Sequence, residues 1–550
     1  MAQLFYAHKA VRLGLPCYFI ESTAPNNVDD GPEPEPTETE LGGELAPIDA
    51  DAAVAEIADH LARAQAPNLV VMVHGFNNPR LAALGLYQKL ATAAAADPFV
   101  KDRRDLICIG YRWPSEKITE PLSSTRQALP AFPADILGFG AAAVVALLAL
   151  YLVSLAFDLE DVWWLSLPWH LLVVASLAGI GLVVVGMLLR IVVYFRDGYR
   201  AINYAVPDLL EVIRQIDAKV NELSAGAPKR IDLSFIGHSM GAYVVTNAIR
   251  ALTDLFAPDS LRPSLNSGTI VEPSAQVPMV RPEIGHVFRL KRFLLASPDI
   301  PAETLMSNRA NFLEPSLRRF EEAYLFGNEG DEVLRLISTT ANYFSFPTKS
   351  STFGYRLGNV EILSRGYGVI EPPPHELLRS LRVGANTLHA LYKELRDAGL
   401  AGEKRKASVE GAKASYQKNL ASLFSYFDCT DYVDVTGDGG PARGLLTYAL
   451  KRKAADATAR LGFGDQARLL IGYLRGGPNV HGGYFDGVLS RQLIVRLACL
   501  GYAATLESYG GADAFAETCE ARQIRVVISP HLAHPDAVVA TAEAPPSDGA

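Results

Sequence analysis

The residue of this chain best suited to nucleophilic chemistry is Ser239, the centre of the pentapeptide Gly237-His238-Ser239-Met240-Gly241. The pentapeptide fits the pattern G-x-S-x-G, which places a serine at a sharp, strained turn between a strand and a helix. Glycines are needed there because strand and helix pass very closely. The chain has 44 glycines, so the alternative is a purely structural turn. We expect Ser239 to be a nucleophile, because a strand-like apolar run precedes it and helical spacing follows.

A serine hydroxyl needs a histidine to take its proton and a carboxylate to orient that histidine. When the serine lies on such a turn, the chain order is serine, acid, histidine. Asp299 and Asp331 both follow predicted strands beyond Ser239. We favour Asp331, because it lies in a glycine-rich turn directly before a predicted helix. Asp299 is kept as the alternative acid; otherwise it shapes the pocket or caps a helix.

Several histidines lie beyond both acids, and His481 is the one we predict to be the base. It lies in the loop Asn-Val-His-Gly-Gly-Tyr-Phe-Asp-Gly, 479–487, where glycines allow the chain to bring an imidazole over the serine. The alternative for His481 is an ordinary surface-loop residue. The other candidates are His375, His389, His531 and His534.

An oxyanion site is predicted where the apolar run Asn68–Val73 ends in His74-Gly75-Phe76. In this arrangement one backbone N–H comes from the residue after the nucleophile, and another comes from the loop after an earlier strand. Those groups would be the N–H groups of Met240 and Phe76. His74 itself is expected to be a structural histidine, since the base comes last in the chain order.

These residues require an α/β domain to position them. Apolar runs of strand type alternate with helical patterns, which predicts a mostly parallel sheet with helices on both faces, here the α/β-hydrolase fold. The predicted strands are 18–20, 68–73, 105–110, 231–236, 289–296, 321–326, 432–435 and 525–529, and the predicted helices are 51–64, 84–96, 204–223, 242–252, 395–426, 446–474 and 488–500, with another starting at 333.

The domain is expected to span 51–530, with helical insertions at 395–480. Residues 1–50 would supply a first strand and an acidic, proline-rich loop at 26–43, which we expect to be solvated and disordered. Residues 535–550, rich in alanine and proline, are expected to form a disordered tail.

A transmembrane hairpin is predicted at 134–196, inserted within this domain. The runs 136–157 and 165–195 are nearly free of charge, and about 20 apolar residues suffice to span a bilayer. An acidic turn and two tryptophans separate them, and arginines follow the second, which places the turn outside and the rest in the cytoplasm. The alternative is a pair of buried core helices.

Composition limits the other possibilities. The net charge of −9 does not favour a nucleic-acid partner, which requires a basic face. The five cysteines are scattered, so neither a disulfide framework nor a metal site is indicated. We expect no metal and no organic cofactor. The N-terminus has no apolar run long enough for a signal sequence.

The motif set resembles that of bacterial α/β hydrolases grouped as a domain of unknown function, the DUF900 type. It consists of His74-Gly75-Phe76-Asn77-Asn78, Tyr111-Arg112-Trp113-Pro114-Ser115 and the pentapeptide around Ser239. The resemblance covers about 68–114 and 230–490 and implies a serine hydrolase with no defined substrate. The hairpin and the long insert before His481 depart from that pattern.

Together these features predict a serine hydrolase held in the bacterial inner membrane as a multi-pass protein. Its substrate is expected to be an ester or thioester, with lipid-derived compounds as candidates, and the bilayer is its expected partner. Two alternatives stay open: a non-catalytic scaffold with the same fold, and a peptidase or amidase. The oligomeric state is not indicated by the sequence.

Overall fold

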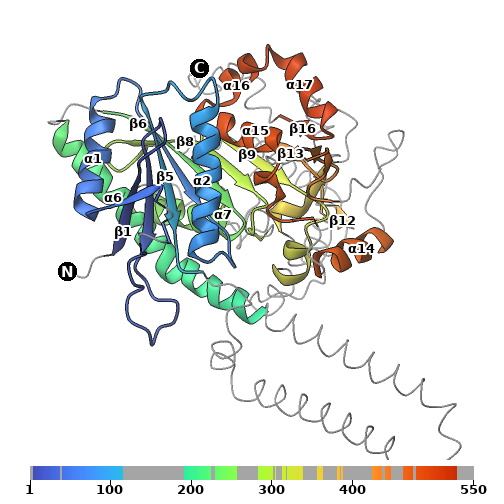
Figure 1. Cartoon of the computed structure of the whole chain (residues 1–550), viewed down its shortest axis with the longest axis horizontal. Helices are drawn as coiled ribbons and strands as arrows, with labels where there is room; N and C mark the ends of the chain where they lie inside the picture. Colours follow the sequence, from blue (N-terminus) through green and yellow to red (C-terminus); the bar gives the residue numbers. More distant parts are fainter. Residues whose placement is uncertain are drawn as a thin grey trace, which may run out of the picture.

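The computed structural model describes the greater part of the chain, shown in colour in Figure 1. The described residues are 4–37, 40–41, 43–115, 191–224, 229–256, 283–301, 304, 313–317, 319–338, 356–362, 381–383, 386–387, 424–435, 440–447, 463–474 and 478–528.

An 11-stranded sheet organises the described part, in the order β16-β13-β9-β8-β6-β4-β5-β2-β1-β3, with β7 paired to β8. Neighbours from β13 to β2 run parallel, whereas β16, β1, β3 and β7 add antiparallel pairs. The strands are β1 Phe5–Ala10, β2 Cys17–Ser22, β3 Leu45–Ile48, β4 Asn68–Val73, β5 Leu106–Arg112, β6 Ile231–His238, β7 Glu283–Ile284, β8 Phe288–Ala296, β9 Glu322–Gly327, β13 Ser425–Asp428 and β16 Arg525–Val527.

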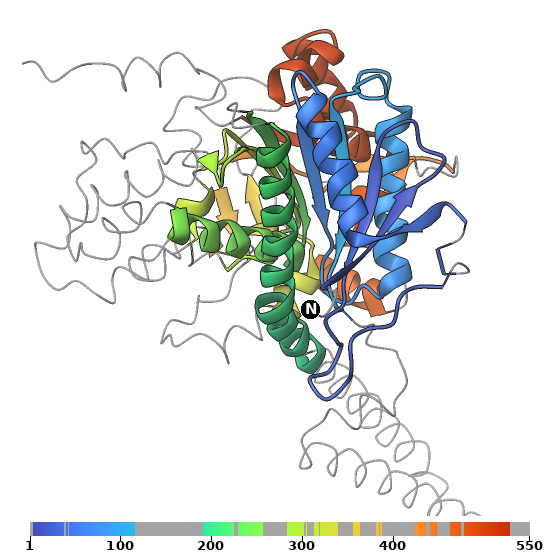
Figure 2. The same ribbon diagram turned by 90° about the vertical axis from the view of Figure 1, so that its left-hand side faces the viewer.

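Helices cover both faces of this sheet, so the described part has three layers. On one face α1, α6 and α7 pack together, and on the other lie α2, α15 and α17. Figure 2 shows the green helices α6 and α7 and the blue helix α2 on opposite sides of the strands. The helices are α1 Ala50–Arg63, α2 Arg80–Ala96, α6 Val206–Leu223, α7 Met240–Phe256, α14 Phe463–Leu474, α15 Val488–Cys499, α16 Tyr502–Ser508 and α17 Ala512–Ala521.

Short elements complete the described structure. The short helices are α9 Glu314–Leu317, η1 Ala201–Ala205, η4 Val333–Ser338, η5 Leu357–Asn359 and η6 Gly483–Phe485. One small sheet consists of β10 Val360–Ile362, β11 Leu381–Val383 and β12 Asn386–Thr387. Another consists of β14 Val433–Asp434 and β15 Arg443–Gly444. Residues 191–200 are also helical and lead into η1.

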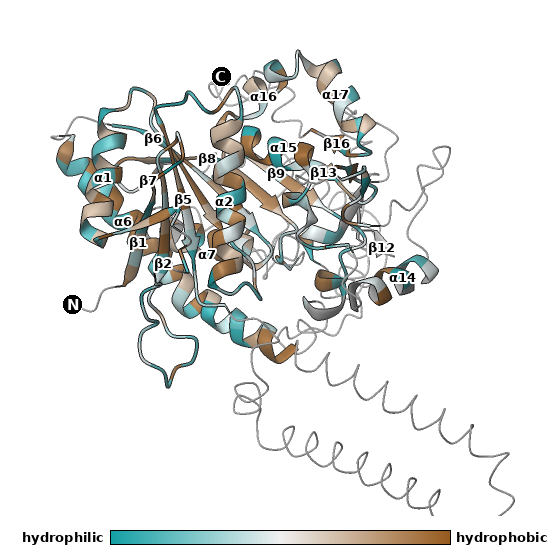
Figure 3. Ribbon diagram, in the orientation of Figure 1, coloured by the Kyte–Doolittle hydropathy of each residue, from teal (hydrophilic) through white to brown (hydrophobic). Residues whose placement is uncertain are grey.

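The central strands are apolar on both faces, and this is why they are buried between helix layers. In β4, Val71 and Val73 face the core formed with α1, α6 and α7, whereas Val70 and Met72 face α2 and α15. Figure 3 shows the strands in brown, the apolar colour, and teal on the outer surfaces of the helices. The predicted α/β class, with a mostly parallel sheet and helices on both faces, is confirmed.

One predicted strand lies elsewhere. The strand beside β9 is β13, Ser425–Asp428, and not 432–435, of which only Val433–Asp434 forms a short hairpin pair. Tyr426 was predicted to be the last residue of a charged helix, 395–426, and Phe427 lies directly after it. Their side chains face opposite sides of the sheet, and both are buried. A parallel strand between two helix layers allows this, because successive side chains of a strand point to opposite faces.

The N-terminal residues also differ from the prediction. Three strands, β1 to β3, extend the sheet where only 18–20 was expected. The acidic segment after β2 is attached to the body, because Glu33 pairs with Arg112 and Arg80 donates to the Pro34 carbonyl. Arg112 is buried and needs carboxylate partners, which the described part of the acidic segment helps to supply. The segment is exposed at 28–32 and at Pro34, as expected for a solvated loop, whereas Glu33 and the Pro34 carbonyl have defined partners in the body.

Other predictions fall outside the described residues. These are 134–190 of the predicted hairpin, the tail 535–550 and most of the insertions between 395 and 480. Within the described ranges, no helix combines the length and the apolar character needed to cross a membrane.

Candidate functional site

The predicted site residues gather at the carboxyl ends of the central parallel strands. β4 lies between β5 and β6, so the chain leaves β4 toward one edge of the sheet and leaves β6 toward the other. The carboxyl ends of two such strands form a crevice in open α/β sheets, and ligands bind there. Gly75 follows β4 and Ser239 follows β6, which puts both at this crevice.

Ser239 occupies a sharp turn between β6 and α7. Its φ is +53°, in the left-handed region that a serine rarely adopts. The turn is fixed on both sides, since Ser239 N–H donates to the Ala296 carbonyl at 2.9 Å and the Ser239 carbonyl accepts from Asp299 N–H at 3.1 Å. A β-carbon at Gly241 would lie 2.3 Å from the Val73 carbonyl oxygen. Glycine is therefore required there for α7 to pass over β4.

His481 and Asp331 form a direct hydrogen bond. His481 Nδ1 lies 2.7 Å from Asp331 Oδ2. The carboxylate is held by further donors: its Oδ1 accepts the N–H groups of Val333 and Leu334 at 3.1 Å, and its Oδ2 accepts the Ser297 hydroxyl at 2.9 Å. Asp331 is fully buried. Oδ1 of Asp331 therefore caps the start of η4, whereas Oδ2 orients the imidazole of His481.

Three buried polar atoms at the site have no hydrogen-bond partner among the described residues: the Ser239 hydroxyl, His238 Nδ1 and His481 Nε2. Such orphaned groups are uncommon, and each calls for an explanation. The His481 loop lies beside the turn that carries the serine, because the ring of His238, next to Ser239 in the chain, has its centroid 4.9 Å from that of His481. The arrangement leaves the imidazole nitrogen opposite Asp331 available to take a proton from a hydroxyl.

The loop after β4 lies against the serine. A β-carbon added to Gly75 would stand 2.6 Å from the β-carbon of Ser239. Phe76 is the next residue, and Met240 is the first residue of α7, where backbone N–H groups have no carbonyl of a preceding turn to pair with. The two predicted oxyanion donors are the N–H groups of Phe76 and Met240. They belong to the residues directly after Gly75 and Ser239, which are in contact.

The two neighbouring histidines are neutral structural groups. Burial lowers the pKa of His74 to about 3, and burial followed by the charge of His481 lowers the pKa of His238 to about 3. His74 stacks on Trp113 with ring centroids 5.1 Å apart. His238 Nε2 donates to the His481 carbonyl at 3.1 Å, since a carbonyl oxygen can only accept. His74 links the backbone groups of Gly75 and Trp113, and His238 supports the His481 loop.

Asp299, the alternative acid, lies at the same edge but has other partners. Its carboxylate pairs with Arg356 at 3.2 Å and accepts the Ser338 hydroxyl at 3.0 Å. Its backbone, not its side chain, contacts Ser239. The structure therefore brings Asp331 to His481 and uses Asp299 to hold Arg356 and the end of η4.

Asn328 was not singled out from the sequence. Its side-chain N–H donates to the Val480 carbonyl at 2.8 Å, and its Oδ1 accepts Gly330 N–H at 2.9 Å. It thereby ties the turn that carries Asp331 to the residue before His481. Its place three residues before Asp331, in a glycine-rich turn after a strand, is the only sequence signal of this role.

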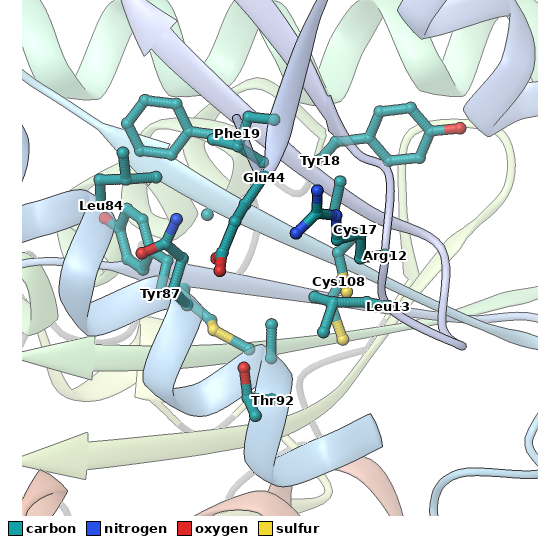
Figure 4. A pocket seen from close by; sticks show the side chains of 16 residues that line it. Arg12, Leu13, Cys17, Tyr18, Phe19, Glu44, Leu84, Tyr87, Thr92 and Cys108 are labelled. Atoms are coloured by element: carbon teal, nitrogen blue, oxygen red, sulfur yellow. The ribbon is translucent and has the colours of Figure 1, made fainter. Parts of the chain in front are cut away.

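A cavity of about 270 Å³ lies apart from this site, between α2 and the strands β1, β2 and β5. Figure 4 shows Cys17, Phe19, Tyr87 and Cys108 among its mostly apolar lining. Ser239, His481 and Asp331 do not line it. The Tyr87 hydroxyl accepts His74 N–H at 3.0 Å, so this side chain separates the cavity from the loop after β4.

No family model, curated protein or solved structure matches this chain. Function therefore has to be argued from the site itself. Among the described residues, no group of three His, Cys, Asp or Glu side chains could hold a metal ion. The chemistry that the described site offers is that of a hydroxyl, an imidazole, a carboxylate and backbone N–H groups.

Proposed function

We propose that this chain is a serine hydrolase of the α/β-hydrolase fold, with Ser239 as nucleophile, His481 as general base and Asp331 as the acid that orients it. The observation that carries the proposal is the 2.7 Å hydrogen bond from His481 Nδ1 to Asp331, with His481 Nε2 and the Ser239 hydroxyl left as unpaired buried atoms. Other buried polar atoms of the described residues also lack a partner, but these two belong to the serine and the acid-paired histidine that acyl transfer requires.

The fold assignment is supported by topology as well as by the residues. Ser239, Asp331 and His481 follow in that chain order, as in α/β hydrolases. Each comes after a parallel strand of the same sheet, namely β6, β9 and β13. The loop after β4, a neighbour of β6, supplies Phe76.

In the proposed reaction, the Ser239 oxygen attacks the carbonyl carbon of an ester or thioester while His481 Nε2 takes the hydroxyl proton. The N–H groups of Phe76 and Met240 stabilise the negative charge on the carbonyl oxygen. The tetrahedral intermediate collapses, the alcohol or thiol leaves with the proton from His481, and an acyl-enzyme remains. Water then attacks it, His481 takes one water proton, and the acid product leaves as Ser239 regains its proton.

Asp331 supports both proton transfers without itself becoming protonated. Its Oδ2 accepts His481 Nδ1–H, so that Nε2 is the nitrogen left to take the serine proton, and the negative charge stabilises the imidazolium that forms. The hydrogen bonds from Ser297, Val333 and Leu334 keep this carboxylate in one orientation.

The apolar runs at 136–157 and 165–195 support a membrane-anchored enzyme of the bacterial inner membrane, with the catalytic domain in the cytoplasm. A catalytic body held at a bilayer favours an amphipathic acyl substrate, such as a lipid-derived ester or thioester. No cofactor takes part in the proposed steps.

The test is hydrolysis by the full chain in detergent, measured on matched p-nitrophenyl esters, acyl thioesters and acyl p-nitroanilides of increasing chain length. We expect ester and thioester turnover that rises with acyl length and is lost in Ser239→Ala. Turnover of anilides alone would make the chain an amidase, and turnover of none by folded protein would favour a non-catalytic scaffold.

A further inference from the structure

A buried carboxylate, Asp197, holds the loop that carries Phe76. Asp197 belongs to the helix of residues 191–200, which leads through η1 into α6. Its side chain is fully buried, and its Oδ2 accepts Asn77 N–H at 3.1 Å and the Ser115 hydroxyl at 2.6 Å. The carboxylate of this helix therefore reaches the loop after β4 and the residue Ser115 beyond β5.

The same contacts extend to the next residue of the loop. The Ser115 oxygen accepts Asn78 N–H at 3.2 Å, so consecutive backbone N–H groups of the loop are held, one by Asp197 and one through Ser115. Arg200 donates to Asp197 Oδ1 at 2.8 Å and balances its charge. The Asn78 side chain in turn donates to the Gly75 carbonyl at 3.2 Å. The loop after β4 is thus held from outside by Asp197 and Ser115, and from within by the Asn78 side chain.

This fixation matters because the loop is strained. Asn77 has a φ of +58°, in the left-handed region, which costs a non-glycine residue free energy and persists only when its surroundings impose it. Asp197 accepts the N–H of this residue. Phe76 lies directly before it, and its ring packs edge-on against Tyr194 of the same helix, with centroids 5.7 Å apart.

We propose that Asp197 is a positioning residue for catalysis: it holds the Phe76–Asn78 loop in the shape that directs Phe76 N–H at the developing oxyanion. The inference rests on the proposed function of Ser239. Residues 191–195 are the last of the apolar run that the sequence predicts to span the membrane, and Asp197 lies two residues beyond it, so this contact joins the oxyanion loop to that part of the chain.

The test compares three variants of the full chain on the ester that the wild type turns over best. Asp197→Asn keeps the size of the side chain, but its amide can serve either the loop or Arg200 and not both. Ser115→Ala removes the bridge to Asn78 and leaves the Asp197–Arg200 pair intact. Asp217→Asn is the matched control, because Asp217 is a buried acid on α6 that accepts N–H groups of His286 and Val287 before β8, at the other end of the strands.

We expect Asp197→Asn and Ser115→Ala to lower kcat by about tenfold to a hundredfold, the scale expected when a catalytic group is displaced by about 1 Å. KM and the midpoint of the pH–rate profile should stay close to wild type, because neither substitution touches His481 or Asp331. Melting temperatures of all three variants are measured alongside.

The outcomes separate the two proposals. If the wild type has activity that depends on Ser239, and Asp197→Asn and Ser115→Ala lower kcat no more than Asp217→Asn does at equal stability, the positioning role is wrong and the hydrolase stands. A shifted pH midpoint would also overturn it, since it would show a general effect on His481. If the folded wild type has no such activity, the proposed function itself fails.

Discussion

The side-chain amide of Asn328 donates a hydrogen bond to the carbonyl oxygen of Val480 at 2.8 Å. Asn328 follows β9, in the turn that leads to Asp331, whereas Val480 immediately precedes His481, about 150 residues later in the chain. One hydrogen bond thus fixes the turn that carries Asp331 relative to the loop that carries His481.

Asn328→Asp should lower kcat by about tenfold to a hundredfold, because loose positioning of a catalytic group costs this much. The carboxylate can still accept Gly330 N–H but has no N–H to donate to Val480. Steady-state kinetics on the best ester gives the result. The matched control is Asn247→Asp on α7, whose amide donates to the Tyr243 carbonyl one helical turn away. Equal kcat in the two variants would remove Asn328 from the positioning of His481.

Substitution by asparagine distinguishes the roles of the two acids, Asp331 and Asp299. Asp331→Asn should lower kcat by about 10⁴-fold, as in other serine–histidine–acid sites, because the amide no longer holds the His481 tautomer that leaves Nε2 free. Asp299→Asn should chiefly lower the melting temperature, since it weakens the buried pair with Arg356. A larger loss of kcat in Asp299→Asn than in Asp331→Asn would reverse the assignment.

Gly75 is predicted to tolerate no side chain. The added β-carbon of Gly75→Ala would lie 2.6 Å from that of Ser239, so the loop or the serine has to shift. We expect loss of most esterase activity in a protein that still folds. Gly85→Ala in α2 is the control: nothing lies within 4 Å of its β-carbon. Its stability should rise by roughly 0.5–1 kcal/mol, since alanine is preferred over glycine within a helix. Unchanged turnover in Gly75→Ala would contradict the close packing.

The buried His238 should make the protein sensitive to acid. Its pKa is about 3 in the folded state against an ordinary value of 6.5, so the unfolded chain binds the extra proton first as the pH falls. Folding stability is therefore lost progressively from pH 6.5 toward pH 3. His238→Asn lacks this titration, so its melting temperature should fall less steeply than that of the wild type over this range. Parallel curves for the two proteins would show that His238 does not contribute.

Much of the fold follows from local patterns. The central strands are continuous apolar runs, and helices alternate with them, so the α/β class was predictable from periodicity. β13 was not, because Ser-Tyr-Phe-Asp has only four residues and becomes a strand through pairing with β9 and β16. The N-terminal strands β1 and β3 likewise depend on partners far from any strong local pattern.

The candidate site likewise has some residues that the sequence predicts and others that it does not. Ser239 belongs to a local five-residue motif, and the chain order of acid and base limits the choice of Asp331 and His481. Asn328 and Asp197 escape sequence analysis, because their roles lie in contacts to Val480 and Asn77, far away in the chain. Asp197 also lies at the end of an apolar run, where the pattern predicts a membrane boundary and offers no sign of a polar contact.

The central claim is that Ser239 is an activated nucleophile, and the most direct measurement is labelling of the full chain in detergent with a fluorophosphonate probe. The wild type should be labelled, and the modified peptide should carry the probe on Ser239. Ser239→Ala should not be labelled, whereas Ser234→Ala, a change of a buried serine on β6, the strand that leads to Ser239, should be labelled like the wild type. A folded wild-type protein that stays unlabelled, or equal labelling of Ser239→Ala, would contradict the claim.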